Sequence, residues 1–195
     1  MTSIYFARET SQKMKANTFE EQELFQAVLR FDSKALAQVY DLYNPELYRY
    51  AARLLGDLSL AEDCVADTFS RFLKVLSAGR GPKDHLRAYL YRIAHNLIVD
   101  HYRRAPDFVE LKETYPDTDD TPEQEADLRI RQAQMRKAIQ QLTPDQQQVI
   151  AFKYLQGWKN EEIAQALDKP VGAIKSLQHR ALASLQRILS KEKPI

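Results

Sequence analysis

Hydrophobic residues along most of the chain recur at intervals of three and four, the spacing that places them on one face of a helix. In the N-terminal part, Asp32 is the predicted N-cap of a helix that Gly56 ends. Ser59, followed by Glu62, is typical of a capping box and predicts the start of a second helix. The residues expected to face the core are Leu36, Val39, Tyr40, Tyr43, Leu47, Tyr50, Leu54 and Leu55 in the first helix and Ala61, Val65, Phe69, Phe72, Leu73 and Leu76 in the second.

A third helix is predicted over residues 85–104, after a loop that contains Gly79, Gly81 and Pro82. Its core positions are Leu86, Leu90, Ile93 and Leu97. No segment of the chain alternates apolar and polar residues between turns, as a strand would. The pattern therefore predicts an all-α fold.

The C-terminal part begins with a helix predicted over 125–141. Thr143, with Pro144 at the first helical position and Gln146 completing a capping box, starts the next helix, and Gly157 ends it. A short helix over 160–167 and a long one over 170–190 follow, joined by a turn at residues 168–170. This short helix, tight turn and long helix are typical of a helix-turn-helix.

The helical spacing fails between the two parts. Residues 105–125 contain three prolines, eight acidic residues and one basic residue, a net charge of −7, whereas the rest of the chain carries +8. Proline and charge together favour an extended, solvated linker. We therefore predict an N-terminal extension (1–25), a helical domain (26–104), an acidic flexible linker (105–126) and a second small helical domain (127–195). Two net-basic domains indicate a polyanionic partner.

Composition excludes several classes of protein. The chain has 195 residues, of which 44% are hydrophobic and 28% charged, as in an ordinary globular protein. Apolar runs such as Leu97-Ile98-Val99 are far shorter than the roughly 18 residues of a membrane span, and the N-terminus has no export-signal pattern. The one cysteine, Cys64, cannot form an internal disulfide. We expect a cytoplasmic protein without membrane insertion.

The last helix has two distinct faces. At 100° per residue, the positions that form its inward stripe are Val171, Ile174, Gln178, Ala181, Leu185 and Leu189. A second strip contains Gly172, Lys175, Ser176, His179 and Ala183, which combines small residues with three donors that can reach phosphates or base edges in a major groove. The alternative is a solvated face on an ordinary helical hairpin.

The 85–104 helix carries a basic strip, since His85, Arg92, Asn96 and Arg103 project within about 40° of one another. Arg104 and Lys83 add positive charge beside it. Interleaved aromatic residues (Tyr89, Tyr91 and Tyr102) can stack on bases of an opened strand. The alternative is a salt-bridged helix whose tyrosines lie half in the core.

The sequence gives little support for a catalytic site or a metal site. Asp63 and Asp67 share one helical face, but no His, Ser or Lys motif accompanies them, so they indicate a solvated face or a docking surface for a basic partner. Cys64 is expected to be a small core residue. His95 and His101 are six residues apart, which does not align two ligands, so no metal site and no cofactor are predicted.

Three segments together resemble bacterial RNA polymerase sigma factors of the extracytoplasmic-function type. They are AEDCVADTFSRFLK at 61–74, HLRAYLYRIAHNLIVDHYRR at 85–104 and NEEIAQALDKPVGAIKSLQHRALASLQRIL at 160–189. They occur in the order found in that family and are split by an acidic linker. The resemblance implies region 2 in the first domain and region 4 in the second.

The resemblance also implies roles. Region 2 would bind the clamp helices of the polymerase β′ subunit through Glu62, Asp63 and Asp67 and melt the minus-10 promoter element. Asn96 matches a residue that contacts the opened strand, and the loop at 77–84 matches the segment that captures a flipped base. The supporting minus-10 residues are His85, Arg92, Arg103, Arg104 and Lys83.

Region 4 would read the minus-35 element and contact the β flap. Its reading residues would be Lys175, Ser176, His179 and Arg180. The family also implies an anti-sigma factor as a partner, and the linker matches one that threads toward the RNA exit channel.

The sequence departs from the family pattern at three positions. Ala66 replaces a frequent glutamine in the docking helix, Ala173 replaces the usual threonine of the recognition helix, and Leu177 replaces a frequent arginine.

Two other functions compete with promoter-specific initiation. One is a stand-alone helix-turn-helix regulator, and the other is a sigma-like decoy that binds proteins only. An enzyme is the weakest hypothesis because no residue cluster supports one.

Overall fold

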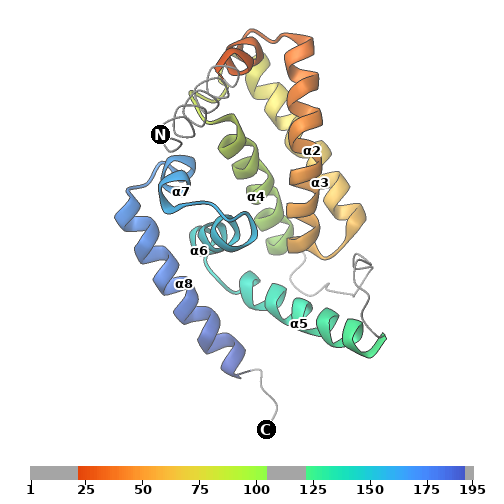
Figure 1. The fold of residues 1–195 in the computed structure, drawn as a ribbon, viewed down its shortest axis with the longest axis vertical. Coiled ribbons are helices and arrows are strands. Elements are labelled where there is room, and N and C mark those ends of the chain that lie inside the picture. Colours follow the sequence, from red (N-terminus) through yellow and green to blue (C-terminus); the bar gives the residue numbers. More distant parts are fainter. Residues whose placement is uncertain (1–21, 105–121, 192–195) are drawn as a thin grey trace, which may run out of the picture.

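A computed structural model of the chain describes residues 22–104 and 122–191, and every regular element in these two ranges is a helix (Figure 1). Residues 22–29 form a short helix. The N-terminal half continues with α2 (Ser33–Leu55), α3 (Leu58–Ser77) and α4 (Leu86–Arg104). The C-terminal half contains α5 (Pro122–Gln140), α6 (Pro144–Ile150), the π-helical turn η1 (Ala151–Leu155), α7 (Asn160–Leu167) and α8 (Val171–Lys191). The predicted linker at 105–126 falls outside the described residues except for the start of α5, and the extension at 1–25 except for residues 22–25.

The ends of α2 confirm the sequence prediction. The Asp32 carboxylate accepts a hydrogen bond from the Ala35 backbone at 2.9 Å and caps the first turn. At the other end, Gly56 adopts a left-handed conformation (φ 72°), in which its N–H donates to the Ala52 carbonyl. A side chain is disfavoured in this conformation, so glycine suits the stop.

The predicted start of α3 at Ser59 is wrong. The helix begins at Leu58, and its N-cap is Asp57, whose carboxylate accepts from the Leu60 N–H at 3.0 Å. Asp57 lies directly after Gly56, so the chain turns and starts the next helix within two residues. A carboxylate caps the first free N–H groups of a helix as well as a hydroxyl does. The helix therefore starts after Asp57, and Ser59 lies within its first turn. Ser59 and Glu62 are exposed.

Helices α2, α3 and α4 pack around an apolar core that follows the predicted stripes. Among the most deeply buried are Val39 and Leu47 of α2, Phe72 of α3 and Leu90 of α4, all at 1% exposure or less. Burial of each such side chain contributes about 1.5–3 kcal/mol. Tyr40 and Leu73 depart from the prediction because 46% and 38% of them are exposed, and the Tyr40 ring contacts Phe69 at a centroid distance of 4.8 Å.

The C-terminal half confirms the Thr143 capping box and the bounds of the short helix. The Thr143 hydroxyl accepts from the Gln146 N–H, and the Gln146 side chain accepts from the Thr143 N–H at 3.1 Å. The one helix predicted up to Gly157 is instead two elements, since the ladder widens to a π-helical turn in η1 after Ile150. This turn places Phe152, which is fully buried, and Leu155 toward the N-terminal half.

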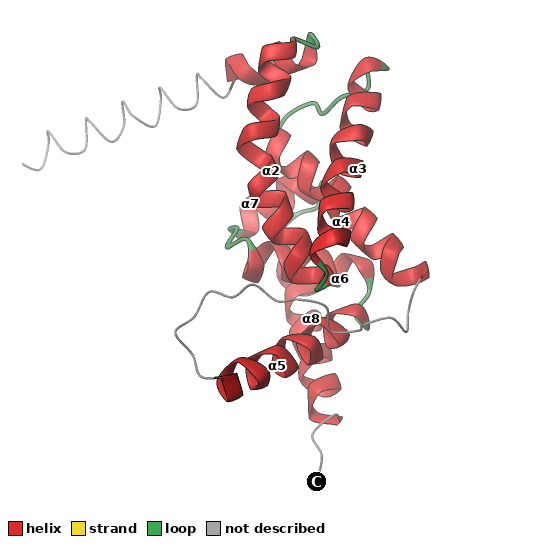
Figure 2. Ribbon diagram, turned by 90° about the vertical axis from the view of Figure 1, so that its right-hand side faces the viewer, coloured by secondary structure: helices red, strands yellow, loops and turns green. Residues whose placement is uncertain are grey.

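The two halves are packed against each other. Figure 2 shows α2, α3 and α4 toward one end of the molecule and α5 with the last turns of α8 toward the other. A single cluster of buried apolar residues runs through both halves, with α7 against α4. Arg136 of α5 lies against Gly56 at the end of α2, where a Cβ atom would sit 2.7 Å from its Nε atom. None of the helices in the described ranges has both the length and the apolar character for crossing a bilayer.

The geometry at Gly56 predicts an unequal effect of two glycine substitutions. Gly56→Ala and Gly79→Ala both force alanine into the left-handed region (φ 72° and 66°), which costs about 1–2 kcal/mol. Only at Gly56 does the new methyl group also meet Arg136, since nothing lies within 4 Å of a Cβ atom at Gly79. We therefore expect Gly56→Ala to lower the free energy of unfolding more than Gly79→Ala, by roughly 1 kcal/mol. Urea titrations of the wild type and the two variants measure the free energies of unfolding. Equal losses in the two variants would contradict a clash between the new methyl group and Arg136.

Candidate nucleic-acid interface

The exposed strip of α8 contains the predicted duplex-reading residues. Lys175, Ser176, His179 and Arg180 are all exposed, while Ile174, Ala181 and Leu185 on the opposite side are buried. The Ser176 hydroxyl donates to the Gly172 carbonyl at 3.0 Å and keeps its oxygen lone pairs available. Because Gly172 and Ala183 are small, no bulky side chain projects from this strip at their positions. A helix with this face can lie in a major groove with its donors toward the bases.

Helix α7 and its turn hold α8 in place. The Lys159 N–H donates to the Glu162 carboxylate at 2.6 Å and starts α7, and Asp168 ends it with a left-handed φ of 52°. The Lys169 ammonium then pairs with Asp145 of α6 at 3.0 Å. The result is a short helix, tight turn and long helix, as the sequence predicts.

The basic strip of α4 is shorter than predicted. Asn96 and Arg103 are exposed on one face of α4, and Arg104 follows at its end. Arg92 is half-buried, with its guanidinium 5.3 Å from the centre of the Tyr89 ring. His85 does not belong to the strip, because α4 begins at Leu86 and His85 has a left-handed backbone (φ 47°).

His85 instead lies with Lys83 at the end of the loop that precedes α4. Both are exposed, and the His85 imidazole is 3.9 Å from the Asp84 carboxylate. The loop therefore presents two basic groups beside the helix rather than along it. Gly79 in the same loop has nothing within 4 Å of a Cβ position, so the loop surface there is open.

The tyrosines of α4 take structural roles, in line with the alternative interpretation. Tyr91 is fully buried, and its hydroxyl donates to Gln156 at 2.8 Å. Tyr102 donates to the Leu54 carbonyl, and Tyr89 is half-buried against Phe72 at a centroid distance of 6.2 Å. Tyr91 is therefore no stacking platform for bases in this arrangement.

The acidic residues of α3 lie on its exposed side, where Asp63 and Asp67 line a hollow with Arg104 of α4. Glu62, Asp63 and Asp67 are exposed, whereas Cys64, Val65 and Thr68 of the same helix are buried. A shallow hollow beside Glu62 is lined by Tyr40, Asn44, Tyr48, Val65 and Ala66. The lining of this hollow is mixed, since Val65 and Ala66 are apolar whereas Asn44 and the tyrosines carry polar groups.

Two buried titratable side chains, Cys64 and His95, are part of the core. The Cys64 thiol approaches the Ala94 carbonyl at 3.7 Å, and burial raises its pKa to about 12, so it stays protonated. Burial lowers the pKa of His95 to about 4, an effect that the backbone of Pro144 offsets only in part. His95 Nδ1 shares a 2.7 Å hydrogen bond with the Tyr50 hydroxyl. Across the described ranges, no three His, Cys, Asp or Glu side chains converge as metal ligands would.

Comparison with known families identifies both halves. A model described as "Sigma-70 region 2" matches residues 39–106, and one described as "Sigma-70, region 4" matches residues 132–185. The first contains α3, α4 and most of α2, and the second contains the C-terminal part of α5, all of α6 and α7, and most of α8.

Individual relatives agree with these matches. The chain is 30% identical over 171 residues to the ECF RNA polymerase sigma factor BldN of Streptomyces coelicolor, covering 86% of this chain and 65% of that protein. It is 30% identical over 166 residues to the ECF RNA polymerase sigma factor SigL of Mycobacterium tuberculosis, covering 82% and 92%. The chain thus spans somewhat less than two thirds of BldN and nearly all of SigL.

Two solved structures have a similar fold. The structure of CnrH in complex with the cytosolic domain of CnrY matches with a TM-score of 0.61 and 24% identity, over 87% of this chain and 97% of that one. The sigma factor RpoE of Bartonella quintana, solved with the anti-sigma factor NepR, matches with a TM-score of 0.56 and 26% identity, over 82% and 99%.

The environment of His95 predicts a pH-dependent stability. Because the folded-state pKa (about 4) lies below the ordinary value of 6.5, the unfolded chain binds the extra proton first as the pH falls. The contribution of neutral His95 to the free energy of unfolding is fully present above pH 6.5 and is lost as the pH falls from 6.5 to 4. Between pH 7.5 and 5 the loss is about 2 kcal/mol.

Urea unfolding of the wild type and of His95→Gln at both pH values isolates this contribution. The variant should lack the His95 part of the pH dependence while keeping the part that comes from carboxylates. If both proteins lose the same free energy of unfolding, His95 is not the group responsible.

Proposed function

Because the chain belongs to the extracytoplasmic-function group of sigma-70 RNA polymerase sigma factors, we propose that it binds core RNA polymerase and directs transcription initiation from specific promoters. Regions 2 and 4 of this family lie in the order that a sigma factor needs. The observation that carries the proposal is the pair of separate exposed reading surfaces, one on α4 and one on α8, each within its matched region. Sigma factors are initiation factors and not enzymes, so we assign no catalytic residue.

In this proposal α8 reads the minus-35 element as duplex DNA. Lys175 and Arg180 reach phosphates or guanine edges, and His179 and Ser176 lie between them on the same exposed strip. Region 4 also contacts the flap of the β subunit. The apolar side of α8 is used for packing and is not available for DNA.

Region 2 opens the minus-10 element. Asn96 contacts the separated strand, and Arg92, Arg103 and Arg104 neutralise its phosphates. Lys83 and His85 act from the loop at 77–84, which captures a flipped base. Removing a base from the stack costs a few kcal/mol, which hydrogen bonds and stacking in the complex offset.

Glu62, Asp63 and Asp67 dock on the clamp helices of the β′ subunit. Their exposure on α3 supports this assignment, and Asp63 and Asp67 line one hollow together with Arg104 at the end of α4. Binding to polymerase and binding to DNA then use adjoining surfaces of region 2. The place of action is the cytoplasm, where polymerase and chromosomal DNA are found.

An anti-sigma factor is a further proposed partner. The related sigma factor RpoE was solved with the anti-sigma factor NepR, and its chain matches 82% of the present one. Such a protein would hold this chain away from polymerase by covering its docking surfaces.

Run-off transcription with purified core polymerase tests the proposal. We expect specific products from genomic fragments only when the chain is added. Asp63→Arg/Asp67→Arg should abolish both the products and co-purification with core polymerase, because two attractive charges become repulsive. Asp41→Arg/Asp127→Arg makes the same charge change at exposed positions outside α3 and serves as the control.

The outcomes separate the competing functions. Core binding without products on any fragment favours a protein-binding decoy. Neither products nor core binding favours a stand-alone regulator.

The two reading surfaces predict different defects. His179→Ala or Lys175→Ala should weaken binding to the minus-35 duplex by about 1–3 kcal/mol for a base contact and less for a phosphate. Asn96→Ala should reduce promoter opening, measured by permanganate reactivity, more than retention of the closed complex. Equal losses in both assays would contradict the role of Asn96, and unchanged transcription in both α8 variants would contradict that of α8.

A further inference from the structure

Helix α8 carries a polar side chain at a position that its inward stripe would fill with an apolar one. Gln178 is half-buried, on the flank between the exposed strip and the buried residues of α8. Its side-chain amide donates a hydrogen bond of 2.9 Å to the hydroxyl of Tyr154 on η1. Tyr154 itself is 53% exposed. An exposed tyrosine is therefore bonded to the edge of the strip that carries Lys175 and His179.

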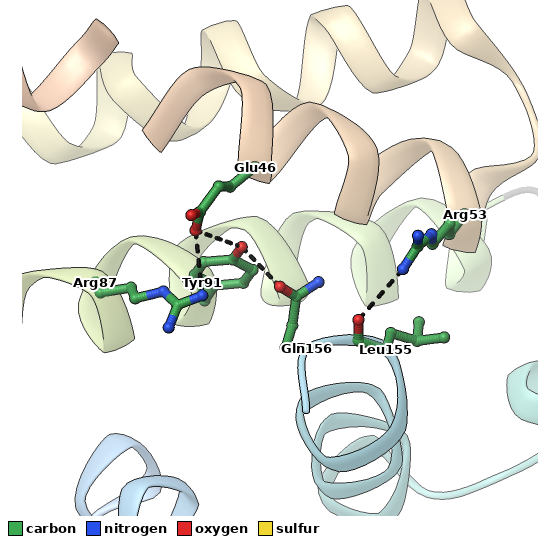
Figure 3. Close-up of polar contacts among 6 residues, drawn as sticks. All are labelled: Glu46, Arg53, Arg87, Tyr91, Leu155 and Gln156. Carbon is green, nitrogen blue, oxygen red and sulfur yellow. Dashed lines mark hydrogen bonds and ion pairs between the residues drawn. The ribbon is translucent and has the colours of Figure 1, made fainter. Parts of the chain in front are cut away.

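The end of η1 that carries Tyr154 is anchored on the N-terminal half of the chain (Figure 3). The carbonyl of the next residue, Leu155, accepts a hydrogen bond from Arg53 at 3.3 Å. The side chain of Gln156 accepts one from the Tyr91 hydroxyl at 2.8 Å. These two contacts fix the backbone directly after Tyr154, so the tyrosine is held in one place beside α8.

Aromatic packing supports the same anchor. The Phe152 ring lies 6.2 Å from the Tyr91 ring and 4.6 Å from the Trp158 ring, and the Trp158 ring lies 5.3 Å from Tyr91. Phe152 is fully buried and Trp158 is 5% exposed, whereas Tyr154 of the same turn stays exposed. Single π-helical turns inside helices occur frequently at functional sites. Here the turn presents one exposed aromatic hydroxyl on a rigid support.

The hydroxyl of Tyr154 keeps its own proton for a further partner. A phenol hydroxyl can accept one hydrogen bond and donate another. Gln178 fills the accepting role, and no acceptor for the proton of Tyr154 is found among the residues that the structure describes. Because a hydrogen bond polarises the group that accepts it, this hydroxyl is a stronger donor than a free one. An anionic oxygen, as in a phosphate, is the acceptor that such a donor binds best.

The geometry of α8 places this donor where a phosphate of a bound duplex would lie. Arg180 and Gln178 are two positions apart, about 200° around the helix axis, so they lie on opposite flanks of the strip. A helix with its side chains is about 10–12 Å across and the major groove about 12 Å wide, so each flank of an inserted helix faces a phosphate backbone. One flank carries the cation of Arg180, and the other carries the hydroxyl of Tyr154.

We propose that Tyr154 is a further DNA-binding residue, which donates a hydrogen bond to a phosphate of the strand opposite the one that Arg180 contacts. Gln178 is its positioning residue. This inference rests on the proposed function of α8 as a duplex reader. A phosphate contact fixes the register of the helix in the groove and carries no base preference of its own. Because the tyrosine is neutral, it strengthens binding without releasing a counterion.

Binding of the full chain to a duplex with the minus-35 element of a transcribed fragment tests this, measured by fluorescence anisotropy from low salt upward. Tyr154→Phe removes one oxygen and should weaken binding about three- to tenfold at every salt concentration. Arg180→Ala should also lower the slope of log affinity against log salt, by about 1. Gln178→Leu should show part of the loss of Tyr154→Phe. Gln38→Leu, the same change at an exposed position of α2, should leave the affinity unchanged.

Neutral methylphosphonate substitutions in the duplex locate the contacted phosphate. Each substitution removes the charge of one phosphate and replaces one of its oxygens by a methyl group. At the phosphate that Tyr154 contacts, the loss of affinity seen with the wild type should shrink severalfold with Tyr154→Phe. At phosphates of the other strand, the two proteins should respond equally. Such non-additivity is expected for groups in contact and not for distant, independent ones.

The outcomes distinguish this inference from the proposed function. If Tyr154→Phe binds as tightly as the wild type while Arg180→Ala binds more weakly, the phosphate contact is overturned and α8 remains the reader. A weaker Tyr154→Phe that responds like the wild type to every methylphosphonate also overturns it, as does lower transcription with unchanged duplex binding, which indicates a contact with polymerase. Failure of the wild type to bind the duplex overturns both the inference and the reading role of α8.

Discussion

The packing of Phe152 and Trp158 on α4 is the interaction on which the rest of the arrangement depends. Helix α4 is covered by α2 and α3 on one side and by the C-terminal half on another, so Leu90, Tyr91, Ala94 and Ile98 are all buried. What remains of its surface is the narrow strip with Asn96 and Arg103. The same packing that stabilises the helix therefore limits the proposed nucleic-acid surface of α4 to a few residues.

The contacts between the halves are a mixture of apolar burial and polar pairs. Burial of an aromatic side chain contributes about 1.5–3 kcal/mol, whereas a hydrogen bond such as that from Tyr91 to Gln156 contributes about 0.5–1.5 kcal/mol net. Burial also raises the pKa of Tyr91 well above its ordinary value, so its hydroxyl remains a donor at any physiological pH. The apolar burial therefore contributes more to the packing of the two halves than the polar pairs do.

Features set by neighbouring residues could be predicted from the sequence, whereas contacts between distant segments could not. The bounds of α7 follow from its composition, and the Thr143 capping box follows from three residues within one turn. The start of α3 was misassigned because Asp57 and Ser59 both qualify as caps, and only the tight turn at Gly56 decides between them. Helical periodicity places Tyr91 beside an apolar stripe, but it cannot reveal that Gln156, 65 positions later, occupies the other side. His85 was placed on α4 because a projection assumes helical backbone, which its φ of 47° excludes.

The exposed residues on α8 also explain why, in the proposed function, α8 and α4 have to act together. Three basic or titratable side chains, Lys175, His179 and Arg180, can make only a few phosphate and base contacts, and such binding is weak and salt-dependent. The strip on α4 is no larger. When two weak readers are held at the spacing of their targets, the second binding event becomes intramolecular, and the combined affinity exceeds either alone by orders of magnitude. The gain vanishes when geometry forbids simultaneous engagement. In the proposed function, α4 and α8 are therefore selective for a promoter only when both engage their elements at once, a selectivity that neither surface has alone.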